Sequence, residues 1–194
     1  MLFLSVIFPL AFIGLVAGNP VVVEDICPGN KVVTSTQFIG KDKNVKMETI
    51  TCDTPNASDA VEKGALLEAG QSINVCGAAC DTHCFQPSGG GPDPNDCHII
   101  ADALRFDSQN VGPMFTVATS TTGVCDSNNT LSLSFASCTT FFRNQGNVDL
   151  EYCRTDFASL VDFIAPNCQA TQNAHGGLCI SKETLGWFVQ VQHS

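Results

Sequence analysis

Hydrophobic and polar residues repeat with a helical period in one part of the chain that begins near Pro94. The apolar residues of this segment recur at the spacing of one helical face: Cys97, Ile100, Ala101 and Leu104. Asp93 can cap a helix here, and Pro94 suits the first helical position. The pattern predicts a helix from Pro94 to about Asp107, with Cys97 joining this helix to the core.

A second helical pattern follows Thr155-Asp156, which can start a helix. Its apolar stripe consists of four residues, namely Phe157, Leu160, Val161 and Ile164. Pro166-Asn167 should end the helix, because proline cannot donate a helical hydrogen bond. The preceding segment, Leu150 to Cys153, is either the first turn of this helix or a separate strand.

Elsewhere the period changes to two, which is typical of half-buried strands. Residues 115–117 and 131–135 read as antiparallel strands joined by a loop, and residues 185–191 form a late strand that must pair inside the sheet. Residues 19–75 look β-rich or irregular, with short strand candidates at Val21–Val23 and Lys31–Thr34. The order of elements predicts an α+β fold, an antiparallel sheet covered by helices.

The first 18 residues hold an uncharged apolar run followed by small residues, the layout of a signal peptide. This run lacks the usual Lys or Arg after Met1, so a retained membrane anchor is the competing interpretation. An anchor needs about 20 apolar residues, and the run is shorter. We expect a secreted protein, with no membrane association after cleavage.

The chain contains 11 cysteines, which in a secreted protein indicate disulfides. We expect nine of them to form the core disulfide set: Cys76, Cys80, Cys84, Cys97, Cys125, Cys138, Cys153, Cys168 and Cys179. Cys27 and Cys52 are expected to differ from that set. The odd number leaves one thiol unpaired or pairs it between two chains.

Charge and motifs exclude several functions. The net charge of −10 argues against nucleic-acid binding, which needs clustered Lys and Arg, and leaves neutral ligands such as sugars open. Hydrolase motifs such as Gly-x-Ser-x-Gly and His-Glu-x-x-His are missing from the sequence. Cys76, Cys80, His83 and Cys84 do not have zinc or iron–sulfur spacing. No catalytic residue, cofactor or metal is therefore predicted.

Glycosylation sequons begin at Asn56 and Asn128.

Several motifs together resemble one family. The run from Cys84 to Leu104 contains Pro-Ser-Gly-Gly-Gly-Pro followed by an Asp-Cys helix, and it looks like a segment of small secreted proteins from mushroom-forming fungi, the glycan-binding Y3-like proteins. Further matches are Ser137-Cys138, Leu150 to Cys153, Asn167-Cys168 before Gly176 to Cys179, and the end from Trp187 to Ser194. The resemblance covers residues 76–194 and leaves residues 19–75 as an N-terminal extension.

This resemblance implies an α/β/α-type sandwich, a homodimer formed through the sheet, and recognition of extracellular glycans without catalysis. The chain is more distantly similar to the Hce2 necrosis-inducing effectors and the KP4 killer toxins, so a secreted toxin or effector is the alternative. A sugar site needs an exposed aromatic ring and nearby polar side chains. Candidate residues are Trp187, Tyr152, Asn144, Gln145 and Arg154, although core packing is the competing interpretation for Trp187 and Tyr152.

Overall fold

The computed structural model of the protein describes residues 26–27, 30–52, 72–87, 89–119, 129–172, 174–182 and 186–194. Five predicted features lie outside these residues: the signal peptide at residues 1–18, the strand candidate Val21–Val23, the sequon asparagines Asn56 and Asn128, and Cys125.

The fold is α+β, as the sequence predicted, and is built on a seven-stranded antiparallel sheet with the order β1-β2-β6-β7-β10-β9-β4. The strands are β1 (Lys31–Ile39), β2 (Val45–Cys52), β4 (Cys80–Cys84), β6 (Thr130–Phe135), β7 (Cys138–Asn144), β9 (Gly176–Ser181) and β10 (Trp187–His193). The late strand β10 pairs with β7 on one side and β9 on the other, so its predicted place inside the sheet is confirmed.

A smaller sheet has the order β3-β8-β5. Its strands are β3 (Ser72–Asn74), β5 (Met114–Val117) and β8 (Asp149–Cys153). Leu150 to Cys153, which the sequence left open as a first helical turn or a separate strand, therefore belongs to strand β8. One expectation is wrong: β5 pairs with β8 and not with β6, because the chain moves from the small sheet to the large one between them.

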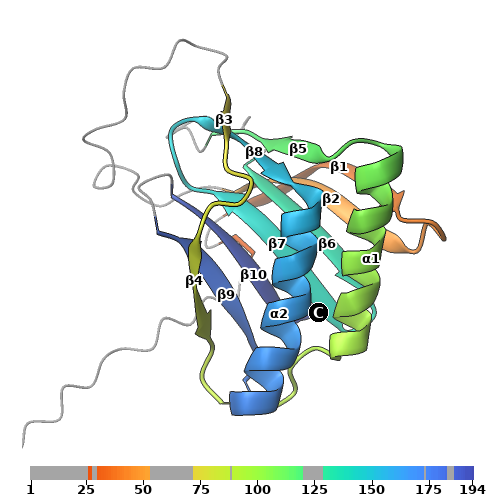
Figure 1. Cartoon of the computed structure of the whole chain (residues 1–194), viewed down its shortest axis with the longest axis vertical. Coiled ribbons are helices and arrows are strands. Elements are labelled where there is room, and N and C mark those ends of the chain that lie inside the picture. The colour runs from red at the N-terminus through yellow and green to blue at the C-terminus, as the bar shows by residue number, and fades with distance from the viewer. Residues whose placement is uncertain are drawn as a thin grey trace, which may run out of the picture.

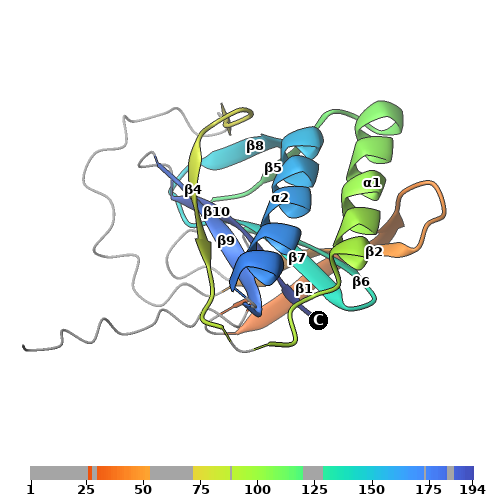
Figure 2. The ribbon, with the colours of Figure 1, turned by 60° about the horizontal axis from the view of Figure 1, so that its bottom comes forward.

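Both helices lie on the same face of the large sheet (Figures 1 and 2). The first, α1 (Pro94–Asn110), begins as predicted: the Asp93 carboxylate caps it by accepting a 2.8 Å hydrogen bond from the Asn95 backbone N–H. The predicted apolar face of α1 is buried against the core. In the described part of the chain, no helix is both long and apolar enough to cross a lipid bilayer.

The second helix, α2 (Arg154–Gln172), passes through Pro166, so the predicted end at that proline is wrong. Proline removes one backbone hydrogen bond of a helix, to the carbonyl four residues earlier, but it does not forbid continuation when packing holds the following turn. Here Ile164, Ala165 and Cys168 are buried, and Cys168 is cross-linked to β4. Burial and the cross-link outweigh the lost bond.

The N-terminal segment is part of the main sheet. Strand β1 covers the predicted Lys31–Thr34 strand and extends it to Ile39, and β2 joins this hairpin to β6. Residue 75 is therefore no boundary in the fold, because β1 and β2 share one hydrogen-bonded sheet with strands from residues 76–194.

Aromatic side chains fill the space between the large sheet, the small sheet and α2. The Phe142 ring of β7 stacks on Tyr152 of β8 at 4.8 Å and on Trp187 of β10 at 5.5 Å between ring centroids. Phe115 of β5 meets Phe142 edge-on at 5.8 Å, and Phe157 of α2 packs beside Phe115 at 6.0 Å. These five rings join both sheets and α2 into one core.

Five disulfides connect these elements: Cys27–Cys52, Cys76–Cys153, Cys80–Cys179, Cys84–Cys168 and Cys97–Cys138. The last confirms that Cys97 ties α1 to the sheet. Cys76, Cys80 and Cys84 each bond to a different element, so none of the three is a thiolate available to a metal. Cys27 and Cys52 do differ from the others, since they pair with each other in a small separate cluster around Ile50. Such a set is typical of proteins that fold in an oxidising compartment.

The ten described cysteines all pair with one another, so they leave no partner for Cys125 in the same chain. Alkylation of the denatured, unreduced protein should therefore label Cys125 alone, or find Cys125 in a disulfide between two chains. Peptide mass spectrometry makes the assignment. Label on any of the ten other cysteines would contradict this connectivity.

Candidate ligand-binding surface

The two predicted aromatic site residues belong to the core. Trp187 is fully buried and Tyr152 is 2% exposed, and their ring centroids lie 5.4 Å apart. Burial in this cluster raises the pKa of the Tyr152 hydroxyl. Neither ring presents a face on which a sugar could stack, so the packing interpretation, left open by the sequence, is the one that the geometry shows.

Asn144 and Arg154 are also interior. The buried Asn144 amide donates hydrogen bonds to the carbonyls of Ala118 at 2.9 Å and Val148 at 2.8 Å, which holds the loop before β8 against the end of β5. Arg154 donates from Nε to the Gly112 carbonyl at 2.9 Å, where α1 ends. Burial lowers the pKa of its guanidinium, although Asp107 opposes that effect. Both side chains hold elements in place.

Gln145 is the one member of the predicted set with an exposed side chain. Its backbone N–H donates a 2.6 Å hydrogen bond to the Gly186 carbonyl, beside the start of β10. The structure does bring the predicted residues close together, since Asn144 pairs directly with Trp187 across β7 and β10. The four other side chains are buried inside the molecule, however, and Gln145 alone of the set reaches its surface.

A different aromatic residue is exposed on the sheet. Phe38 of β1 is 54% exposed, although its neighbour Ile39 is buried in the core at 3%. Successive side chains of a strand point to opposite faces of the sheet. Because Ile39 packs on the side of the helices, Phe38 projects from the opposite face of the large sheet.

Polar side chains surround Phe38 on that face. Phe38 pairs with Lys46 of β2, and Thr36 pairs with Glu48, so all four side chains project in the same direction. The Lys46 ammonium lies 2.5 Å from the Glu48 carboxylate. On the next strand, Ser134 of β6 is opposite Lys46. We call this set, Thr36, Phe38, Lys46, Glu48 and Ser134, the Phe38 face.

The Phe38 face combines an aromatic ring with hydroxyl, carboxylate and ammonium groups on adjacent strands. An exposed ring can stack on the apolar side of a sugar, and these polar groups can exchange hydrogen bonds with its hydroxyls. Sequence reasoning missed it because residues 19–75 lay outside the family resemblance. The sequence does contain a signal for an exposed aromatic ring, namely the adjacent apolar residues Phe38 and Ile39. Because neighbouring strand residues point to opposite faces of a sheet, only one of the two can be buried when the core lies on one face.

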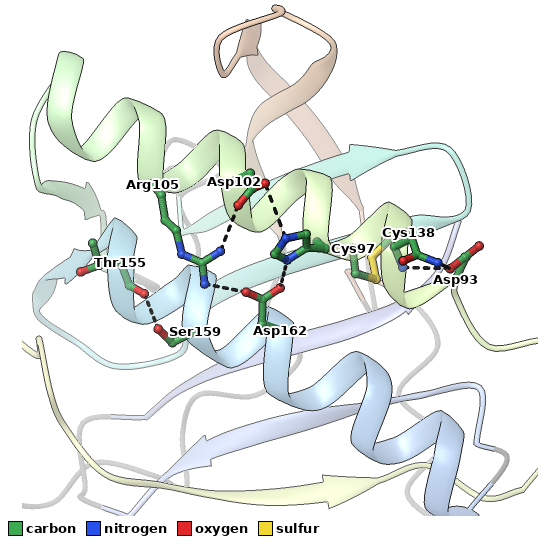
Figure 3. A network of polar contacts seen from close by, with 10 residues as sticks. Asp93, Cys97, Asp102, Arg105, Cys138, Thr155, Ser159 and Asp162 are labelled. Atoms are coloured by element: carbon green, nitrogen blue, oxygen red, sulfur yellow. Dashed lines mark hydrogen bonds and ion pairs between the residues drawn. A yellow bond between two sulfur atoms is a disulfide. The ribbon is translucent and has the colours of Figure 1, made fainter.

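A second polar surface crosses the seam between the two helices (Figure 3). His98 Nδ1 of α1 lies 2.9 Å from Asp162 Oδ1 of α2, and Arg105 Nη2 lies 2.5 Å from Asp162 Oδ2. Asp102 completes the network, 3.2 Å from Arg105 Nη1 and 3.6 Å from His98 Nε2. The Asp162 carboxylate of α2 therefore contacts two basic side chains of α1, His98 and Arg105.

The charges of this network shift the titration of its members. The hydrogen bond from Asp162 raises the pKa of His98, although partial burial and Arg105 oppose this shift. The same carboxylate raises the pKa of Arg105. Because each side chain is more than a quarter exposed, solvent screens these ion pairs. The network thus works as a screened electrostatic link between α1 and α2.

Comparisons with protein-family models, with curated proteins and with solved structures find no match to this chain.

The raised pKa of His98 predicts a pH-dependent link between the helices. The contacts of charged His98 with Asp162 and Asp102 stabilise the fold fully below the ordinary histidine pKa of 6.5, and their contribution is lost as pH rises through the higher pKa of folded His98, whereas the Arg105 ion pairs remain. In NMR titrations, Asp162→Asn should lower the His98 pKa more than Asp102→Asn does. His83 is the internal reference, and an unchanged His98 pKa in Asp162→Asn would refute the link. Asp162→Asn should lower the free energy of unfolding by less than about 1 kcal/mol, because the His98–Asp162 pair is partly exposed to solvent.

Proposed function

We propose that this chain is a secreted, non-catalytic glycan-binding protein and that the Phe38 face is its sugar site. The observation that carries the proposal is a phenyl ring, 54% exposed, on a sheet face that also presents Thr36, Lys46, Glu48 and Ser134. Five disulfides support an extracellular location, since such cross-links persist in oxidising surroundings.

The chemistry of the face favours a neutral sugar. The Lys46 ammonium is already paired with Glu48, so this face offers hydrogen bonds without a strong net charge. The whole chain carries a net charge of −10, which repels sulfated or phosphorylated ligands. A neutral sugar can meet the ring through its C–H groups and the surrounding side chains through its hydroxyls.

Edge strand β1 suits the homodimer that the resemblance implies. Residues 31–38 are all exposed, and β1 ends the strand order of the large sheet in the described part of the chain. Antiparallel pairing of two β1 strands places a two-fold axis perpendicular to the sheet. Both copies of the Phe38 face would then lie on the same side of one continuous sheet, which favours multivalent binding to glycan surfaces.

Replacing Phe38 by Ala tests the sugar site, with Phe163→Ala as its matched control. The two rings are similarly exposed, at 54% and 52%, but Phe163 lies on α2. On a broad glycan array, the wild type should bind a related set of neutral glycans. Phe38→Ala should weaken that binding about tenfold, the equivalent of about 1.4 kcal/mol of lost stacking. Phe163→Ala should bind like the wild type.

Equal losses in both variants, or no glycan binding by the folded protein, would refute the site. The second outcome would favour the alternative, a secreted toxin or effector, and growth-inhibition assays on fungal and other cells would then test that class.

A charged residue on β1 tests the dimer. Lysine on an edge strand disfavours pairing with another strand, so Val33→Lys should convert a dimer to monomers in light scattering at fixed concentration. Val111→Lys serves as control because Val111 is an exposed apolar residue just after α1. A wild-type protein that stays monomeric when concentrated would contradict the dimer without bearing on the Phe38 face.

A further inference from the structure

His175, the residue just before β9, and His193, at the end of β10, face each other. In the register of these antiparallel strands Gly176 pairs with Gln192, so the next pair outward consists of His175 and His193. Their ring centroids lie 6.0 Å apart, with the ring planes 25° from parallel. His193 is exposed and His175 is half-buried, so solvent reaches the pair.

The backbone beside this pair is held tightly. A Cβ atom on Gly176 would lie 2.1 Å from the Val191 carbonyl oxygen and 2.9 Å from Gln192 Cα, so only glycine permits this close approach of β9 to β10. Strand β10 is also hydrogen-bonded to β7 on its other side. The separation of the two histidine backbones is therefore fixed by the sheet.

A hydrogen bond sets the tautomer of His193. Its Nδ1 atom lies 2.9 Å from the main-chain oxygen of Ser194, and because that oxygen can only accept, Nδ1 carries the proton. The lone pair of the neutral ring is then on Nε2. Metal-binding histidines usually donate their other ring N–H to a carbonyl or carboxylate in this way, which orients the ring and makes it a better ligand.

The two ring centroids are close enough for both imidazoles to reach one ion once a nitrogen of each ring turns toward it. A metal ion bound by an imidazole nitrogen at about 2.0–2.1 Å lies about 3.2 Å from the ring centroid. Two imidazoles on one ion therefore have centroids up to about 6.4 Å apart when the ion lies directly between them. The distance between the centroids becomes shorter as the nitrogen–metal–nitrogen angle decreases. The observed 6.0 Å is within this reach.

We propose that His175 and His193 form a two-histidine site for a divalent transition-metal ion of the Cu²⁺, Ni²⁺ and Zn²⁺ group, with water completing the coordination. Imidazole nitrogens suit these ions, whereas Ca²⁺ and Mg²⁺ prefer oxygen ligands. The expected affinity order follows the general one for such ligands, with Cu²⁺ bound most tightly. This site uses none of the residues of the Phe38 face, so it is independent of the proposed sugar binding.

The test is calorimetric titration of the purified, disulfide-bonded protein with Zn²⁺ and with Cu²⁺, in a Cys125→Ser background so that no free thiol supplies a ligand. We expect one ion per chain. His175→Ala and His193→Ala should each weaken binding more than about tenfold, because each removes one of two protein ligands. His83→Ala and His98→Ala are the matched controls and should bind like the background protein. Ca²⁺ should give no saturable signal.

Electron paramagnetic resonance of the Cu²⁺-loaded background protein gives a second measurement that does not depend on any histidine variant. Coupling of the copper spin to two imidazole nitrogens is the expected signature. Saturable binding that persists in the His175→Ala/His193→Ala double variant, equal losses in the control variants, or no saturable binding to the folded background protein would each overturn the proposal.

Discussion

The stacked rings of Phe142, Tyr152 and Trp187 are the contact on which the rest of the structure depends. They come from β7, β8 and β10, so a single cluster fixes the small sheet against the centre of the large one. Phe157 adds α2 to the same cluster. Rings of this size remove a large apolar area from water, and their offset contacts add a directional term. The position of α2 over the sheet follows from that packing.

Disulfides then hold the helices where the core has placed them. Cys97–Cys138 ties α1 to β7, and Cys84–Cys168 ties α2 to β4, so each helix has a covalent link to a different part of the sheet. In chain-entropy terms, loops of 41 and 84 residues are closed, each worth on the order of 4 kcal/mol. The ion pairs of Asp162 add only a weak, screened link between α1 and α2.

This arrangement separates the surfaces to which we assign ligands. Both helices cover one face of the large sheet, and Phe38 projects from the other face near the β1 edge. The histidine pair belongs to the ends of β9 and β10, close to the turn that joins β6 to β7, since the Ser194 N–H donates to the Ser137 carbonyl. A rigid, cross-linked sheet suits both surfaces, because side chains on strands keep their spacing without an ordering cost on binding.

Local patterns in the sequence determined most of the secondary structure. Asp93-Pro94 and the spacing of Cys97, Ile100 and Leu104 specify α1, because capping and helical periodicity are properties of neighbouring residues. The same holds for β6 and β10. Tertiary structure alone decided the partners: that β5 pairs with β8, that α2 continues through Pro166, and that Trp187 lies inside while Phe38 lies outside. These outcomes depend on which residues far apart in the sequence pack together or form disulfides. The local sequence around a residue does not specify such long-range contacts.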